Sequence, residues 1–569
     1  MTTIESSPEA TAAVESDPDA RGTVSAAESD TEIESFLAPI ADTIGSTDHK
    51  VIGSFYLGGG LLGLLAVVVV NVLLAVERID GAEALLDEGA LPQLFDAQRI
   101  GLVFGALLPL AIAACVYAVP LQLGARAIAF PRLAASGFWM WLGGLVLNIV
   151  ALVNNGGTLG SDADMVGLFV ASMGLMAVGL TATAGSVATS ILTTRAPGMT
   201  LRRVPPFSWS ALVFSLGLIL VMPVFVGTLT YVFLDHRNGR SAFGGNEGIF
   251  DWVGWMVTQP ATFLFAVPAV GVFAEALPIT FGRRLPGRGL MFAGLALIGV
   301  AAFAAVTQQN LQGLPWEGSG LDTTDLADKT QDLVPYLLFN VLPVIGVVIV
   351  ALVALLTARP DGEIKVRLNP AFVFGFFGFG MILVGMVGHL LYAIDDLGLQ
   401  GTVFEEATLI YVVYGAAIGA MGAAAHWAPK LWGVELSTAK SAPLAGAAVA
   451  GTVLAAFPLY IAGFLDQPAG AVYDDGDLSV WNIVSTVGHA VVLFALLAFV
   501  GLLAAGLRAR RRDGAAVDDP WDGQTLEWAT TSPAPRDNFA DVPVVNSAEP
   551  LLDLKQAGSA SATNDGSNA

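Results

Sequence analysis

Residues 251–270 read Asp-Trp-Val-Gly-Trp-Met-Val-Thr-Gln-Pro-Ala-Thr-Phe-Leu-Phe-Ala-Val-Pro-Ala-Val. The run is mostly apolar, and about 20 residues rising about 1.5 Å each can cross a bilayer core of roughly 30 Å. Pro260 and Pro268 interrupt it, and each is expected to kink a helix because proline lacks a backbone N–H. The polar residue Gln259 directly precedes the first proline. The stretch therefore predicts a bent membrane-spanning helix with a polar side chain at the bend.

The composition of the whole chain indicates a membrane protein. Of the 569 residues 54% are hydrophobic and only 13% are charged, and the mean hydropathy is +0.68. A soluble domain of this size would need a core out of proportion to its surface. The net charge of −23 argues against nucleic acid as a partner. The single cysteine, Cys115, excludes intrachain disulfides and cysteine-rich metal sites.

Hydropathy divides the chain into two acidic tails and an all-α, polytopic membrane domain of about twelve helices. Residues 1–47 and 510–569 are predicted to be disordered tails, because they are polar, acidic and without periodicity. Residues 48–509 hold the membrane domain. Its predicted spans are 51–76, 101–123, 133–154, 164–192, 208–234, 251–281, 289–309, 333–357, 371–394, 405–428, 442–465 and 480–507.

The positive charges predict the orientation of the spans. Of the Lys and Arg residues in the loops and at the span ends, 18 lie on the side of the N-terminus, including Arg510, Arg511 and Arg512 just after the last span, and five lie on the other side. Short cytoplasmic loops are enriched in Lys and Arg. We therefore expect a multi-pass protein of the cell membrane, in contact with membrane lipid, with both termini in the cytoplasm. No internal repeat is visible, which weakens the case for a transporter built from two related halves.

Several stretches, in order along the chain, resemble subunit I of the heme-copper oxidases, the cytochrome c oxidase family. The matching stretches are Thr47–Gly53, Val119–Arg132, Arg195–Thr200, Gln259–Phe263, Trp427–Gly433 and Trp481–Gly488. The resemblance implies the helical bundle of that subunit. It also implies two hemes and one copper, a place in a respiratory electron-transport chain, and other oxidase or respiratory subunits as partners.

This sequence departs from the family pattern at the positions of the metal ligands. The family places histidines there, because neutral imidazole is a strong ligand for iron and copper. Counting from nearby landmarks puts other residues at all six positions, namely Gln98, Gln259, Gln308, Gln309, Ala407 and Leu409. Phe263 stands where many relatives have a tyrosine. We therefore expect no catalytic residue, no cofactor-binding residue and no metal ligand, and we expect the glutamines to form a small polar cavity instead.

The remaining ionisable residues in the spans have plainer interpretations. His389, His426 and His489 lie in three different predicted spans without a second ligand at helical spacing, so we interpret them as structural. Glu275 lies deep in the sixth span and is the candidate ion-path residue, with a buried hydrogen-bonding role as the alternative. A second group of carboxylates is expected to form a solvated rim on the outer side, and consists of Asp395, Asp396, Glu405 and Glu406.

Three functions remain open on the sequence. The favoured hypothesis is a cofactor-free paralogue, a pseudoenzyme with a structural, assembly or regulatory role in the membrane. The second is a cytochrome c oxidase-type subunit that reduces dioxygen with proton translocation, against which the substituted ligands weigh. The third is a channel or transporter that reuses the cofactor cavity, for which Glu275 and the glutamines are the motivation.

Overall fold

The computed structural model describes residues 42–79, 86–240, 242–245, 248–304, 334–359, 366–472, 476–542 and 544–556. The chain divides into two units, Met1–Ser46 and Thr47–Ala569. Most of the first unit, and with it the predicted N-terminal tail, lies outside the described residues, so the fold below is that of the second unit.

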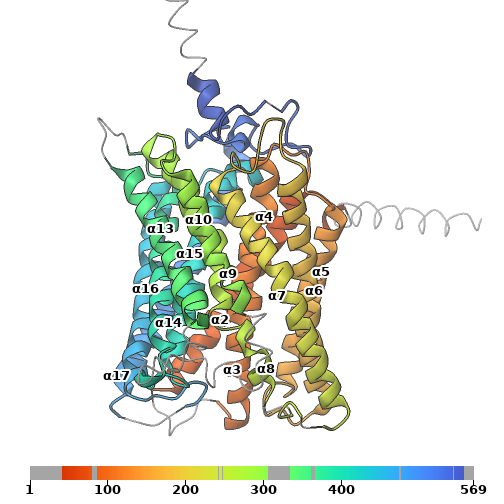
Figure 1. Cartoon of the computed structure of the whole chain (residues 1–569), viewed down its shortest axis with the longest axis vertical. Coiled ribbons are helices and arrows are strands. Elements are labelled where there is room, and N and C mark those ends of the chain that lie inside the picture. Colours follow the sequence, from red (N-terminus) through yellow and green to blue (C-terminus); the bar gives the residue numbers. More distant parts are fainter. Residues whose placement is uncertain are drawn as a thin grey trace, which may run out of the picture. The chain divides into compact units, whose positions relative to one another are not determined.

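The described part of the second unit is built from helices, without a named strand (Figure 1). Eleven helical stretches are long and apolar enough to cross a bilayer, which confirms the all-α membrane fold. They are α2 (His49–Glu77), α3 to α4 (Leu91–Gln122), α5 (Pro131–Val153), α6 (Ala163–Thr193), α7 (Pro206–Arg237), α8 to α9 (Ile249–Phe281), η4 to α13 (Val334–Ala358), α14 (Pro370–Tyr392), α15 (Phe404–Trp432), α16 (Thr438–Phe464) and α17 (Ser479–Asp513).

The seventh predicted span corresponds to a shorter apolar helix, α10 (Arg288–Gly299), whose apolar stretch continues to Ala304. The rest of that predicted span lies outside the described residues. The remaining elements are η1 (Glu88–Ala90), α3 (Leu91–Ile100), η2 (Gly101–Leu107), α4 (Leu108–Gln122), α8 (Ile249–Val253), η3 (Gly254–Met256), α9 (Ala261–Phe281), η4 (Leu337–Val341), α13 (Leu342–Ala358), η5 (Asp395–Leu397) and η6 (Leu526–Ala529).

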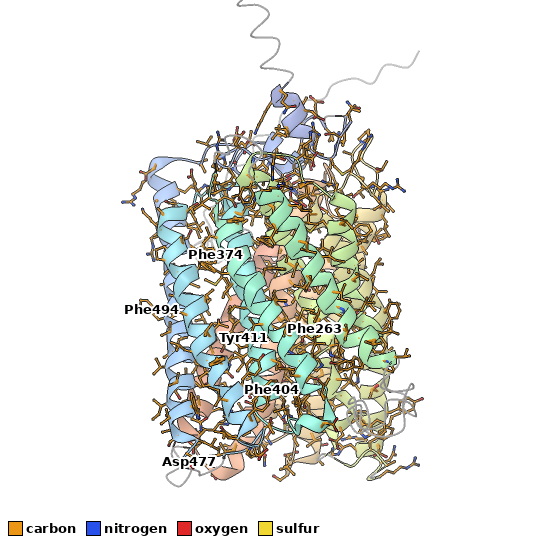
Figure 2. The ribbon with its side chains drawn as sticks, turned by 60° about the vertical axis from the view of Figure 1, so that its left-hand side comes forward. Phe263, Phe374, Phe404, Tyr411, Asp477 and Phe494 are labelled. Carbon is orange, nitrogen blue, oxygen red and sulfur yellow. The ribbon has the colours of Figure 1, made fainter. Side chains whose placement is uncertain are left out.

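Three spans form the centre of the bundle, and the others surround them. The apolar parts of α4, α9 and α15 are buried nearly all round, whereas most of the apolar part of α17 is exposed. In Figure 2, Phe494 projects from the outer side of α17, and 67% of its surface is exposed. Phe263 and Tyr411, by contrast, are almost fully buried. A helix that is apolar on every side is suited to such a central position.

Glycines allow several neighbouring helices to approach closely. A Cβ added to Gly137 in α5 would lie 2.6 Å from the carbonyl oxygen of Gly179 in α6. A Cβ on Gly378 in α14 would lie 2.4 Å from the carbonyl oxygen of Gly415 in α15. Small residues at such crossings let backbones pack closely where lipid offers no hydrophobic driving force.

The sixth span is broken rather than merely bent. The short helices α8 and η3 end at Met256, and α9 begins at Ala261 after Pro260. Pro260 has no N–H to give to a preceding turn, and it disfavours helical backbone in the residue before it. Pro268, in contrast, lies inside α9 without ending it. The break places Gln259 in a non-helical segment between two helical pieces.

The C-terminal residues 514–556, which we call the cap, differ from the disordered tail that the sequence predicted from residue 510. Helix α17 continues to Asp513, and the cap then packs across one end of the bundle (Figure 1, dark blue). Lys430 Nζ donates to the carbonyl oxygen of Asp518 at 2.7 Å, and Asn538 Nδ2 donates to that of Ala125 at 2.7 Å.

The prediction failed because the cap buries a few isolated apolar side chains rather than a periodic face. Leu526 and Trp528 are nearly inaccessible to solvent, although Thr525, Glu527 and Thr530 lie beside them in the sequence, and Val545 is buried as well. Averaged over a window, such a segment has the composition of a linker.

Candidate functional site

A chain of buried polar side chains begins at Gln98, the first predicted ligand position. Gln98 Nε2 donates to Asn71 Oδ1 at 2.9 Å, and Asn71 Nδ2 donates to the Tyr414 hydroxyl at 2.8 Å. The same hydroxyl lies 2.9 Å from Nδ1 of His489 in a hydrogen bond. The four residues come from α3, α2, α15 and α17, so this series of hydrogen bonds, the polar chain, links four helices. Buried polar groups in a membrane protein need such partners.

An ion pair lies beside this chain, at the end of the bundle opposite the cap. The two terminal guanidinium nitrogens of Arg78 donate to the carboxylate of Glu406, at 2.9 and 2.8 Å. Glu406 is 9% exposed, so the solvated rim that the sequence predicted is wrong for this residue. Glu406 lies in the first turn of α15, and its carboxylate also accepts from the backbone N–H of Gly470 at 3.1 Å.

A cavity of about 10 Å³ separates the polar chain from the ion pair. Its lining includes Asn71, Gln98, His489, Arg78 and Glu406. That volume holds about one water molecule. Of the two predicted glutamines that the structure describes, Gln98 lines this cavity and Gln259 does not.

Gln259, at the predicted copper position, belongs to a separate network. Its Oε1 accepts from Thr408 Oγ1 at 3.4 Å, and its Nε2 has no hydrogen-bond partner among the described residues. Ala407 and Leu409 lie on either side of Thr408 in α15, and both are buried. Their side chains carry no atom that could bind a metal.

The donor set at these positions does not fit a heme iron or a copper ion. Gln98 and Gln259 offer amide groups that already take part in hydrogen bonds, and amide oxygen is a far weaker ligand than imidazole. Gln308 and Gln309 lie outside the described residues. The described part of the chain holds no group of three or more His, Cys, Asp or Glu that could bind a metal ion.

The histidines of the spans lie in three different surroundings. The His489 ring is held by Tyr414, as described above. The His389 ring packs between Phe263 and Tyr392, with centroid distances of 5.5 and 5.6 Å. The His426 ring packs against Trp521 and Trp528 of the cap, with centroid distances of 6.0 and 5.1 Å. The structure does not bring these three histidines together.

Glu275 lies where α9 meets the cap. Its carboxylate accepts from the backbone N–H of Phe207 at 3.2 Å and from the Thr525 hydroxyl at 3.4 Å. Glu527 of the cap lies nearby, and accepts from Gln122 Nε2 at 3.1 Å. Burial raises the pKa of Glu527, which is fully shielded from solvent. Two buried carboxyl groups, each hydrogen-bonded to other residues, therefore lie at the join between bundle and cap.

Sequence reasoning missed Asn71, Tyr414 and Glu527. Asn71 carries a detectable signal, since it is an amide in the middle of an otherwise apolar span. Tyr414 carries none, because a tyrosine in a span is usually interpreted as a packing residue. Glu527 lies in a segment that resembles a tail, so nothing local indicates that it is buried.

Comparison with known proteins gives consistent results. The family model described as cytochrome c and quinol oxidase polypeptide I matches residues 51–307. Cytochrome c oxidase subunit 1 of Bacillus subtilis is 28% identical over 549 residues, which cover 92% of this chain and 84% of that protein. Cytochrome bo(3) ubiquinol oxidase subunit 1 of Buchnera aphidicola subsp. Schizaphis graminum is 26% identical, covering 90% of this chain and 79% of the relative.

A solved structure of a heme-copper terminal oxidase dimer has a similar fold. It matches with a TM-score of 0.52 and 12% sequence identity, and covers 91% of this chain and 89% of the matched chain. At that identity the match concerns the fold alone.

Proposed function

Because this chain belongs to the heme-copper oxidase subunit I family, we propose that it is a member that works without heme or copper. In this proposal it is a pseudoenzyme that serves as a structural, assembly or regulatory subunit in the membrane. Its role is then to present a stable helical bundle to other proteins rather than to transfer electrons.

The observation that best supports the proposal is the hydrogen bonding of Gln98. In the family this position would hold an axial ligand, whereas Gln98 here is the first member of a hydrogen-bonded chain through Asn71 and Tyr414 to His489. The one imidazole close to the position is therefore already engaged. A cavity of about 10 Å³ beside it supports the same conclusion, because it has room for one water and no ring system.

The test is the heme and copper content of the purified chain. We expect well below one heme and one copper per chain, from absorbance of the reduced pyridine complex and from elemental analysis of protein expressed with heme supplied. A relative that carries the family's histidines, prepared in parallel, is the control for loss of cofactor during purification. One or two hemes per chain would overturn the proposal and favour the oxidase alternative.

We further propose that the protein lies in the cell membrane with both termini in the cytoplasm, on the strength of the Lys and Arg distribution. The chain would then associate there with other oxidase or respiratory subunits, as an assembly or regulatory role requires. The transport alternative draws less support, because Glu275 accepts hydrogen bonds from Phe207 and Thr525, as a structural carboxyl does.

A further inference from the structure

A polar pocket of about 280 Å³ opens at the end of the bundle opposite the cap. Its lining comes from α3, from the broken sixth span and from the region between α14 and α15. The lining residues are Arg99, Phe250, Asp251, Gly254, Val257, Thr258, Tyr392, Gln400, Gly401 and Glu405. The volume is just below the roughly 300–1,000 Å³ of pockets for drug-sized ligands, so it suits a smaller metabolite.

The pocket contains a guanidinium without an ion pair. Arg99 is half-buried and lies over the Phe250 ring, 5.5 Å from its centroid, and it makes no salt bridge among the described residues. Two other carboxylates near Arg99 already have partners of their own. Glu406 is held by Arg78, and Asp96 accepts from the N–H of Thr158 at 2.6 Å. Arg99 and Glu405 both line the pocket without forming a salt bridge with each other, so the guanidinium can donate to an anionic group of a ligand placed there.

A second part of the pocket wall carries carboxyl groups. Glu405 and Asp251 both line the pocket. The Tyr392 hydroxyl donates to Glu405 Oε2 at 3.2 Å, which orients the carboxylate. A carboxylate with one such donor has further lone pairs to offer to a ligand.

This arrangement discriminates between classes of ligand. A simple anion would pair with Arg99 but would be repelled by Glu405 and Asp251. A simple cation would pair with Glu405 but would be repelled by Arg99. Only a molecule that carries both charges can pair with both walls, and in a partly desolvated pocket each such charge-assisted hydrogen bond is stronger than a neutral one.

We infer that this pocket binds a small zwitterion of the α-amino acid type. The ligand carboxylate pairs with Arg99, its ammonium group pairs with Glu405, and its side chain lies against Val257 and Phe250. The inference goes beyond the proposed function and does not depend on whether the chain holds heme.

The test is equilibrium binding to the purified full-length protein in lipid nanodiscs. Each standard amino acid is titrated in turn, and the best binder is then compared with its N-acetyl derivative and its amide. We expect at least one amino acid to bind, and both derivatives to bind about 10- to 100-fold more weakly, because each loses one charge-assisted pair. Failure of every amino acid to bind would overturn the inference, as would equal binding of the N-acetyl derivative.

Variants locate the binding. Arg99→Gln and Glu405→Gln are each expected to weaken binding by about 10- to 100-fold. Arg126→Gln, which changes an exposed arginine at the other end of the bundle, is the matched control and should bind like the wild type. Unchanged binding in both pocket variants would place the ligand elsewhere and contradict the assignment. The comparison of ligand derivatives uses only the wild-type protein, so the test stands even if a variant fails to fold.

Discussion

At the scale of single residues, the Tyr414 hydroxyl is the connecting group of the polar chain. It accepts a hydrogen bond from Asn71 and makes another with His489, and so links α2 and α17 through α15. Tyr414→Phe removes both bonds and leaves the Asn71 amide with a buried N–H and no acceptor. We expect a loss of about 1–2 kcal/mol in the free energy of unfolding, since interhelical bonds in membranes are modest. Thermal unfolding of the protein in nanodiscs measures it.

Tyr411→Phe is the matched control for that substitution. Tyr411 lies one helical turn earlier in α15 and stacks on Tyr460 with a centroid distance of 5.4 Å. Its hydroxyl makes no hydrogen bond with the described residues, so its removal should change stability little. Equal effects of the two substitutions would show that the Tyr414 hydroxyl contributes nothing through its two bonds.

The residues of the polar chain also mark the limit of prediction at this scale. Gln98 could be assigned to a ligand position by counting from Pro109 and Pro120, because the family frame fixes the spacing. Its partner Asn71 is 27 residues away in the sequence, and His489 lies in the last span. Hydrogen bonds between distant helices depend on packing, and no pattern local to one helix records them.

At the scale of elements, the crossing of α14 and α15 depends on two facing glycines. A Cβ on Gly378 would lie 2.4 Å from the carbonyl oxygen of Gly415, so one backbone would have to move. We expect Gly378→Ala to cost about 1–3 kcal/mol of stability by overpacking. Gly380→Ala, two residues along α14, adds a Cβ with nothing within 4 Å and is the control. Comparable thermal midpoints for the two variants would contradict the role given to this crossing.

The elements themselves were the most predictable part of the molecule. Long apolar segments must form helices in a bilayer, since every backbone polar group needs a partner within its own segment. The break before Ala261 was less predictable. A proline in a span is compatible with a kink, as at Pro268, or with a full break, as at Pro260, and the packing of neighbouring helices decides between them.

At the scale of the whole molecule, the cap contacts the bundle through exposed ion pairs and through a buried carboxyl group, Glu527. Exposed ion pairs join Arg367 to Asp522, and Arg284 to Asp553. Hydrogen bonding with Lys555 lowers the pKa of Asp522, and hydrogen bonds from Ser547 and Arg284 lower that of Asp553. The stability from these aspartates is present above their ordinary pKa, near 3.9, and is lost as the pH falls through the lowered values.

Glu527 has the opposite dependence on pH. Burial raises its pKa in the docked cap, so the docked form binds the proton more tightly than the undocked form does. Its contribution to docking is therefore complete below the ordinary glutamate pKa, near 4.3, and is lost as the pH rises through the raised value. Between those limits the two aspartates stay ionised, so the change in docking reflects the buried groups at the join, Glu527 among them. The Glu275 carboxyl and the Lys430 ammonium face the same join and are common to every variant below.

We therefore predict that the cap loosens as the pH rises and that Glu527→Gln removes much of this dependence. Limited proteolysis within residues 514–556 measures the loosening. Dividing the cleavage rate of the wild type by that of the variant, at each pH, cancels the pH dependence of the protease itself. The ratio should increase with pH. Glu435→Gln, which changes an exposed carboxylate outside the cap, should behave as the wild type does. A ratio that stays constant from acidic to neutral pH would mean that the proton on Glu527 does not control docking, and that the ion pairs and the buried Trp528 hold the cap alone.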